Sequence, residues 1–351
     1  MSEHSIQIGG RTVGPGRPCY IIAEMSANHG QDLEQALAIV RAAAEAGADA
    51  VKLQTYTPDT LTIDCDAADF RIGKGTIWEG RNLYQLYAEA FTPWEWQARL
   101  KAEAEALGMD CFSTPFDATA VDFLENLGVV CHKIASFEIV DLPLIRRIAA
   151  TGKPIILSTG MATLAEIEEA VMTARAAGCT QLALLKCNSG YPAPPEEMNL
   201  RTIPHLAQAF GVPAGLSDHT LEIAVPVAAV TLGACILEKH FTLDRSVPGP
   251  DSAFSLEPAE FKAMVQAVRT AEKALGGVRY APSERELPSR AFRKSLYVVR
   301  DIAAGEPFTA DNVRCIRPGH GLHPRHLEQV LGAHACRALT RGTPLSLADL
   351  A

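Results

Sequence analysis

Two polar clusters, each closing on a histidine, end neighbouring apolar runs between residues 213 and 241. The clusters are Ser217-Asp218-His219 and Glu238-Lys239-His240. Alternate side chains of a strand face opposite sides, so Ser217 shares a side with His219, and Glu238 shares a side with His240. Two imidazoles at neighbouring strand ends can hold one divalent cation and leave positions open for substrate oxygens and water. The pattern predicts a metal site at His219 and His240, with hydrogen-bonded structural histidines as the alternative.

Lysines and hydroxyls stand at the ends of the other apolar runs: Lys52, Ser113, Thr114, Lys133, Ser136, Ser158, Thr159 and Lys186. Ammonium groups and small hydroxyls suit phosphate and carboxylate oxygens, so the set predicts an anion site; solvated or ion-paired lysines are the alternative. Glu24 and Glu138 follow the first and fourth runs. Each is a candidate general acid or base, or a partner of a lysine.

Eight apolar runs alternate with stretches of helical period, which predicts β/α units and a parallel sheet. The runs cover residues 19–25, 48–55, 109–115, 129–136, 154–160, 182–187, 213–219 and 234–241. Eight such units predict a closed (β/α)8 TIM barrel, in which catalytic side chains sit at the carboxyl ends of the strands. The polar residues above lie at those ends.

The chain divides into three segments by composition. We expect the barrel domain over residues 1–276, because the last helical stretch runs from about Glu257 to Gly276. Residues 277–294 are rich in glycine, proline and charge, as linkers are. Residues 295–351 contain short strands and tight turns, which indicate a small β-rich second domain.

Composition excludes several classes of function. The 351 residues carry a formal net charge of -9 with scattered cations, so we expect no nucleic-acid partner. Residues 1–20 lack the pattern of a secretory signal and no apolar run is long enough to span a membrane, so we expect a cytoplasmic protein. The nine cysteines lie far apart without a C-x-x-C pair, which is typical of reduced core residues; Cys187 as a nucleophile is the alternative.

The strings IIAEMSANHG, GADAVKLQTYTPDTLTID, FSTPFDATAVDFLE, KIASFE, PIILSTGMATLAEIEEAV, GLSDHT and LEKHFTLDRSVPGPDSAFS together resemble the sialic acid (nonulosonic acid) synthase family. They span most of the barrel. The segment TIWEGRNLYQLYAEAFTPWEWQ is most similar to the pseudaminic acid synthases of that family. The tail resembles the antifreeze-like (SAF) domain that these enzymes carry.

The resemblance implies condensation of phosphoenolpyruvate with an open-chain amino-sugar aldehyde and water, releasing phosphate. For a pseudaminic acid synthase the sugar is 2,4-diacetamido-2,4,6-trideoxy-L-altrose, and the same mechanism with another sugar gives N-acetylneuraminate or legionaminic acid. The family's metal-binding histidines match His219 and His240, normally with manganese, or with magnesium or cobalt. The resemblance further implies a domain-swapped homodimer, in which an arginine matching Arg317 reaches the sugar in the partner's barrel.

Carried over by motif, the phosphoenolpyruvate contacts match Lys52, Thr114, Lys133, Ser136, Ser158 and Ser217. Residues lining the sugar match Gln54, Tyr191 and Asp251, and the family carboxylates match Glu24 and Glu138. This chain has CNSGYP where the neuraminate-type enzymes carry Cys-Thr-Asn, so either Asn188 or Ser189 faces the anion. Tyr56, Trp78, Tyr84 and Phe116 are candidates for an apolar wall against the sugar, or plain packing residues.

Two other functions remain open from the residues. A barrel aldolase with a Schiff-base lysine at Lys133 or Lys186 would need no metal. A third possibility is a carbohydrate-binding or interaction unit in the carboxyl-terminal domain, attached to an inert barrel.

Overall fold

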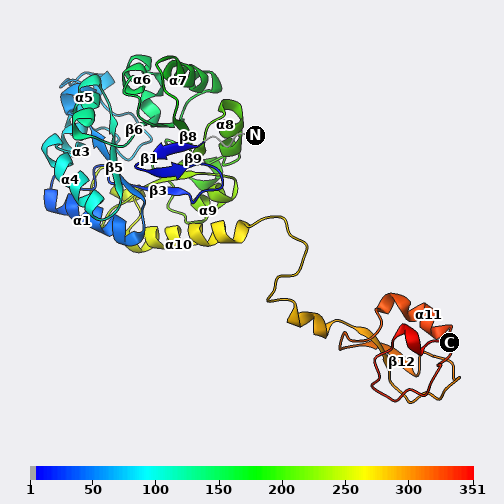
Figure 1. The fold of residues 1–351 in the computed structure, drawn as a ribbon. Coiled ribbons are helices and arrows are strands. Elements are labelled where there is room, and N and C mark those ends of the chain that lie inside the picture. Colours follow the sequence, from blue (N-terminus) through cyan, green and yellow to red (C-terminus); the bar gives the residue numbers. More distant parts are fainter. Residues whose placement is uncertain (1–4) are drawn as a thin grey trace. The chain divides into compact units, whose positions relative to one another are not determined.

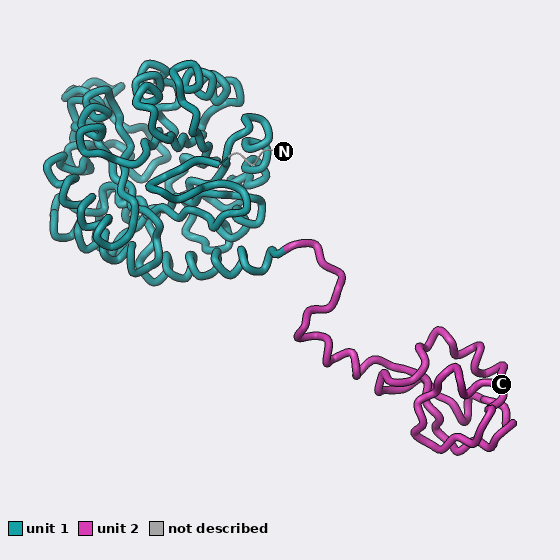
Figure 2. Tube along the Cα trace, in the orientation of Figure 1, with its two compact units in different colours: residues 1–276 teal, residues 277–351 magenta. Residues whose placement is uncertain are grey.

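The computed structural model describes residues 5–351. The chain forms two compact units, Met1–Gly276 and Gly277–Ala351 (Figure 2). Residues 1–4 lie outside the described residues. Two predictions extend over them: the barrel domain at 1–276 and the lack of a signal pattern in residues 1–20.

The first unit is built on a closed barrel of eight parallel strands (Figure 1). Its strands follow one another around the barrel in chain order, and the last, β10, pairs with the first, β3. They are β3 (Tyr20–Glu24), β4 (Ala50–Thr55), β5 (Asp110–Pro115), β6 (His132–Ile134), β7 (Ile155–Ser158), β8 (Leu182–Cys187), β9 (Ala214–Asp218) and β10 (Ile236–His240). Each lies within one of the eight predicted runs, so the predicted barrel is confirmed.

A helix follows each strand and covers the outside of the barrel. These helices are α1 (Leu33–Ala46), α4 (Trp94–Ala106), α5 (Ala118–Leu127), α6 (Leu142–Ala149), α7 (Leu164–Ala176), α8 (Thr202–Phe210), α9 (Ala224–Thr231) and α10 (Pro258–Leu275). Asp32 begins α1 by accepting hydrogen bonds from two free backbone N–H groups, and Gly47 ends it with a φ of 92°. Both bounds of this helix are thus set by local signals in the sequence.

Alternation along the strands produces two hydrophobic layers. Outward-facing residues such as Leu216 and Leu237 pack with the helices, whereas Ile22, Phe112 and Ile156 fill the barrel interior. The interior layer also contains Ile6 and other residues of the antiparallel hairpin β1 (Ile6–Ile8) and β2 (Arg11–Val13), which therefore closes the amino-terminal end. These strands of three residues carry too little alternation to be predicted.

Between β4 and α4 the chain makes a long excursion that contains α2 (Pro58–Leu61), α3 (Leu83–Ala90) and the 3-10 turn η1 (Ala68–Phe70). It starts at the carboxyl end of β4, on the side of the barrel where the predicted site residues lie. Four more 3-10 turns interrupt the connections of the barrel and the linker: η2 (Ser136–Val140), η3 (Pro195–Glu197), η4 (Ser252–Phe254) and η5 (Pro288–Phe292).

The second unit has its own small core around Leu296, Phe308 and Leu339. Its sheet pairs β11 (Ser295–Val298) with β12 (Val313–Ile316), and it also contains η6 (Pro324–His326), α11 (Leu327–Leu331) and η7 (Leu347–Asp349). This is the small antiparallel domain that the turn-rich tail predicted.

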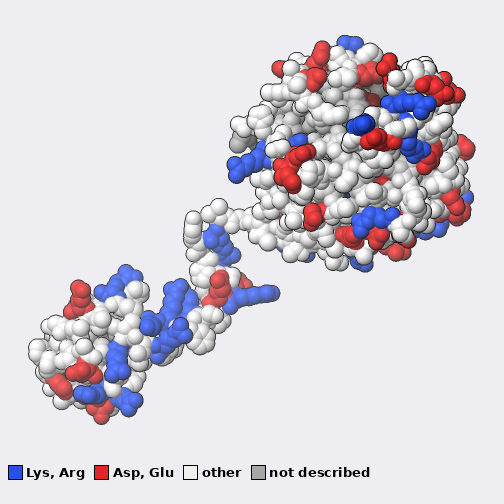
Figure 3. Space-filling view, turned by 180° about the vertical axis from the view of Figure 1, so that it is seen from behind, with Lys and Arg blue, Asp and Glu red and all other residues white. Residues whose placement is uncertain are grey.

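Among the described helices, none is both long and apolar enough to cross a membrane. The face of the first unit seen in Figure 3 carries cations and carboxylates side by side, without a stripe of one sign.

Candidate active site

The inward-facing side chains at the carboxyl ends of the strands are polar and buried. On each strand they follow an inward-facing residue of the interior apolar layer at even spacing, so they face inward as well. Ile22 is followed by Glu24, for example, and Ile236 by Glu238. The buried inward set comprises Glu24, Lys52, Thr114, Lys133, Ser158, Ser217, His219, Glu238 and His240.

Lys52 is at the centre of the first part of this set. Its Nζ lies 2.6 Å from Glu24 Oε2, 3.9 Å from Glu238 Oε1 and 3.2 Å from the Thr114 hydroxyl. Lys52 and Glu24 are both almost completely buried, so water does not screen their interaction. An ammonium group held in this way can bind an anion that enters the barrel mouth.

Lys133 joins the same cluster from β6, two strands along the barrel from Lys52. Its Nζ donates to Ser158 Oγ at 2.8 Å and lies 3.5 Å from Glu238 Oε1, which also accepts from Ser217 Oγ at 3.1 Å. Glu238 therefore counters two lysines. Glu238 was predicted to share a side with His240 but not to be a site residue, although it occupies the same strand-end position as the others.

The two carboxylates of the cluster differ in pKa. Burial raises the pKa of Glu24 to about 7, although Lys52 opposes the shift. Burial also acts on Glu238, but Lys133 and Lys52 outweigh it and lower the pKa of that carboxyl. Near neutral pH, where Glu24 is partly protonated, two lysines face one full carboxylate. This balance favours an anionic ligand, and protonated Glu24 can act as an acid.

Hydroxyl groups gather beside Lys133 around Gly160. Ser136 Oγ accepts a hydrogen bond from Gly160 N at 3.0 Å, and the buried Ser189 Oγ has no partner among the described residues. A Cβ added to Gly160 would lie 2.3 Å from Ser189 Oγ and 2.7 Å from Ser136 Oγ, so a larger residue there would displace both hydroxyls. Asn188 instead turns its amide toward Glu197 at 3.3 Å. Of the two candidates, Ser189 thus has the free hydroxyl.

Lys186 does not belong to this cluster. It alternates along β8 with the inward Leu185 and with Cys187, so its side chain leaves the strand on the opposite face. Its Nζ donates to the carbonyl of Cys187 at 2.7 Å. Its grouping with the anion-binding lysines is therefore wrong, because side chains alternate along β8 and Lys186 falls on the outer face.

The two predicted metal ligands lie side by side, with ring centroids 5.3 Å apart. His219 Nδ1 is 2.7 Å from the carbonyl oxygen of Asn188, which can only accept, so Nδ1 carries the proton and Nε2 has a free lone pair. The buried His240 Nδ1 has no hydrogen-bond partner among residues 5–351. Burial, with His219 as the next cause, lowers the pKa of His240 well below its ordinary value. Burial acts on His219 as well, but Cys187 and the Asn188 carbonyl outweigh it and raise the pKa of that ring. What the pair offers a cation is ring nitrogens without a protein partner.

In the part of the chain that the structure describes, no group of three or more His, Cys, Asp or Glu side chains is arranged to hold a metal ion. A cation at the two histidines would thus take its remaining ligands from substrate or water. Two protein ligands with open positions fit a site in which the metal orients a reactant, and do not fit a closed structural site.

Aromatic rings flank the two histidines. The ring of Tyr191 packs tilted against His219 with centroids 4.3 Å apart, and Phe254 lies edge-on to His240 with centroids 4.8 Å apart. Trp78, from the excursion after β4, packs on Tyr191 at 5.5 Å and donates its indole N–H to Pro250 O at 2.8 Å. These three rings form an apolar wall.

The other aromatic candidates make contacts outside this wall. Tyr56 packs against Phe116 with ring centroids 5.1 Å apart, and the Tyr84 hydroxyl donates to Asp59 at 3.2 Å. Phe254 was not predicted from the sequence.

A chain of hydrogen bonds joins the cluster to Asp251. Gln54 Nε2 donates to Glu24 Oε1 at 3.0 Å and to Ser26 Oγ at 2.9 Å, and the Ser26 hydroxyl donates in turn to Asp251. Burial raises the pKa of Asp251. Three of the residues predicted for the sugar or for proton transfer are therefore connected.

Glu138 lies in η2, with its buried Oε2 lacking a partner among the described residues. Burial raises its pKa from 4.5 to about 7, against the opposing effect of Lys133. Folding thus favours the protonated form: this stabilisation is complete below pH 4.5 and is lost as the pH rises through 7. Glu138→Gln should leave the melting temperature at pH 4 nearly unchanged and raise it at pH 8.5, on the order of 5 °C.

Thermal unfolding followed by circular dichroism at both pH values checks this, with the exposed Glu168→Gln as the control. An equal shift of the Glu138→Gln protein at both pH values would contradict the raised pKa.

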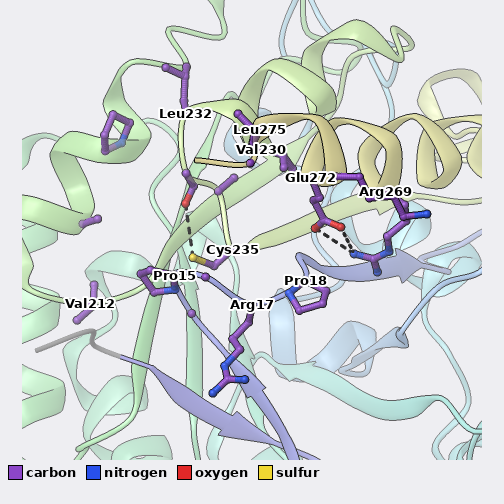
Figure 4. Close-up of a pocket in the computed structure, with 18 of the residues that line it drawn as sticks. Pro15, Arg17, Pro18, Val212, Val230, Leu232, Cys235, Arg269, Glu272 and Leu275 are labelled. Carbon is purple, nitrogen blue, oxygen red and sulfur yellow. Dashed lines mark hydrogen bonds and ion pairs between the residues drawn. The ribbon is translucent and has the colours of Figure 1, made fainter. Parts of the chain in front are cut away.

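A hollow of about 1250 Å³ lies at the opposite end of the barrel (Figure 4). Its lining includes Pro15, Val212 and Cys235, which precede strands, as well as Leu275 at the end of α10. Its acid, Glu272, pairs with Arg269 at 3.2 Å. The chemistry-bearing residues of the strand ends do not line it.

Arg317 follows β12 in the second unit and is exposed. It lies on a different unit from all the other predicted site residues.

Comparisons with known proteins give the chain's relationships. The NeuB family profile matches residues 39–280, and the SAF domain profile matches residues 293–351. The pseudaminic acid synthase of Campylobacter jejuni is 46% identical over 94% of this chain and 96% of its own length. The N,N'-diacetyllegionaminic acid synthase of Legionella pneumophila is 40% identical over 95% of this chain and 94% of its own.

Among solved structures, the N-acetylneuraminic acid synthetase of Leptospira borgpetersenii superposes with a TM-score of 0.73 at 32% identity. The match covers 82% of this chain and 95% of that one. The resemblance found in the sequence is thereby confirmed. The chain belongs to the NeuB family, and its carboxyl-terminal unit matches the SAF domain.

Proposed function

We propose that the protein is a pseudaminic acid synthase. It condenses phosphoenolpyruvate, 2,4-diacetamido-2,4,6-trideoxy-L-altrose and water to pseudaminic acid and phosphate. The observation that carries the chemistry is the buried pair Lys52 and Lys133, countered by Glu238, beside two histidines with free ring nitrogens. The 46% identity to the Campylobacter enzyme supports this choice of sugar.

Phosphoenolpyruvate binds at the lysine end of the cluster. Its phosphate and carboxylate match the ammonium groups and hydroxyls there, because charge-assisted hydrogen bonds to several donors suit oxyanions. We assign this role to Lys52, Thr114, Lys133, Ser136, Ser158, Ser189 and Ser217, whereas the Asn188 amide is engaged with Glu197. The backbone N–H of Gly160 adds a fixed donor next to Ser136.

The sugar aldehyde binds beside the histidines, where the aromatic wall borders them. The methylene carbon of phosphoenolpyruvate forms a bond to the aldehyde carbon, and water adds to the carbon that bears the phosphate. The bond between that carbon and the phosphate oxygen breaks, and a proton from the water leaves with the phosphate. Glu24 protonates the aldehyde oxygen, a role that its pKa of about 7 supports because a proton stays available near neutral pH. Gln54, Tyr191 and Asp251 line the sugar, with Glu138 as a second acid or base near Lys133.

His219 and His240 hold a divalent cation, which we propose is manganese, with magnesium and cobalt as alternatives. When bound, the ion polarises the aldehyde and orients water. His219 is prepared for this role by the Asn188 carbonyl, which fixes its tautomer.

The second unit supplies Arg317 to the sugar. We propose a domain-swapped homodimer with barrel over residues 1–276, a linker at 277–294 and the SAF domain at 295–351. Arg317 of one subunit then completes the barrel site of the other. Since phosphoenolpyruvate is a metabolite of the cytoplasm, we place the reaction there.

Phosphate release from phosphoenolpyruvate with added manganese tests the function. The altrose compound should be turned over at least tenfold faster than its manno-configured isomer or N-acetylmannosamine, and a chelator should stop release. Preference for another sugar would identify a legionaminic or neuraminate synthase with the same chemistry. Release that resists the chelator, with borohydride trapping of the sugar on a lysine, would favour the Schiff-base aldolase.

A further inference from the structure

The two strand-end triplets pair residue by residue across β9 and β10. Ser217 lies opposite Glu238 in the register, and Asp218 lies opposite Lys239. The first pair faces inward and belongs to the anion cluster, where Ser217 Oγ and Glu238 Oε1 are 3.1 Å apart. The second pair faces outward and has no part in the proposed reaction.

Asp218 and Lys239 form an ion pair inside the helix-facing layer. Lys239 Nζ lies 2.6 Å from Asp218 Oδ2, and each side chain is only 1% exposed. Their outward neighbours along the strands, Leu216 and Leu237, belong to the hydrophobic layer between barrel and helices. The ion pair is thus shielded from water between the barrel and its helices.

Thr220 extends the pair beyond His219. Asp218 Oδ1 accepts from Thr220 N at 2.9 Å and Oδ2 accepts from the Thr220 hydroxyl at 3.2 Å. Lys239 donates to the Thr220 carbonyl as well. Asp218 and Thr220, on either side of His219, therefore both bond to Lys239, which precedes His240.

A buried ion pair of this kind is a poor source of stability, because desolvation of two charges offsets their attraction and apolar replacements are often equally stable. The pair instead fixes the relative position of two strands, since its short contact links β9 and β10 at the residues that precede their histidines. A cation held by only two protein ligands depends on those ligands being already in position, because each imidazole that must be ordered on binding costs free energy.

We infer that the Asp218–Lys239 ion pair is a positioning clamp that holds His219 and His240 at the spacing a divalent cation requires. The inference rests on the proposed metal site. Loosening the clamp should weaken metal binding about 10- to 100-fold. It should do so without removing any atom that contacts the cation or the substrates.

The test measures the dissociation constant of manganese for the full-length protein by the electron paramagnetic resonance signal of free Mn²⁺, without substrates. Lys239→Met breaks the pair and leaves Asp218 with Thr220. Because an uncompensated buried carboxylate can impair folding, the double variant Asp218→Leu, Lys239→Met serves as an apolar pair of similar volume. Both variants should bind manganese about 10- to 100-fold more weakly than the unchanged protein.

The matched control is Arg269→Met, which breaks an ion pair with Asp49 and Glu272 at the other end of the barrel. It should lower the melting temperature and leave the manganese dissociation constant unchanged.

Each outcome has one reading. Unchanged manganese affinity in both clamp variants overturns the clamp and leaves the proposed function intact. Equal weakening in Arg269→Met also overturns it, because the effect would then be general loosening of the barrel. If the unchanged protein binds no manganese, magnesium or cobalt, the proposed metal site fails and the clamp fails with it.

Discussion

Replacement of His240 by alanine is expected to abolish metal-dependent phosphate release, with kcat/KM falling by about 1,000-fold or more. The ring of His240 lies 5.3 Å from that of His219, and its Nδ1 has no other hydrogen-bond partner in the described chain. Removing it halves the protein ligands of the proposed cation. Steady-state assays with saturating manganese and measurement of bound metal per subunit check this.

The control is His205→Ala, which removes an exposed histidine of α8. It should change neither quantity. Near-normal activity of His240→Ala with one ion still bound per subunit would contradict the ligand assignment.

Lys133→Met is expected to lower kcat/KM for phosphoenolpyruvate by about 100-fold or more, because one partner of a buried charge cluster is lost. The substitution keeps the length of the side chain but removes the donor to Ser158 and leaves Glu238 with Lys52 at 3.9 Å. The effect should be larger on phosphoenolpyruvate than on the sugar, which is seen by varying each substrate in turn.

Lys186→Met is the matched control, since it removes another strand-end lysine, one whose side chain leaves the barrel on the outer face. It should reduce kcat/KM only slightly. A large loss in Lys186→Met together with normal use of phosphoenolpyruvate by Lys133→Met would place the anion site on the wrong lysine.

The barrel and its orientation were predictable because their signals are local. Glycines such as Gly47 mark the ends of helices, and the period of the apolar residues separates strands from helices over a few turns. The same alternation assigns an inward side to Lys52, Lys133 and His240 once the strands are known. Lys186 was misgrouped only because this rule was not extended to β8.

The long loops were less predictable. Whether Asn188 or Ser189 faces the anion depends on the backbone path after β8, where no periodic pattern exists. The structure turns Asn188 toward Glu197 and leaves Ser189 beside Gly160, a contact between separate loops. Trp78 meets Tyr191 in the same way, from segments more than a hundred residues apart.

The sequence by itself determined which residue types stand at the strand ends, which of them share a side, and the family to which the chain belongs. Only the tertiary structure decided how they combine. Closure of the barrel brings Glu238 of β10 within 3.5 Å of Lys133 on β6, and the pairing of β9 with β10 joins Asp218 to Lys239. The hydrogen-bond partners and the pKa of a side chain depend on its burial and on its distance from other groups. Both are set by strands that the fold brings together from distant parts of the chain.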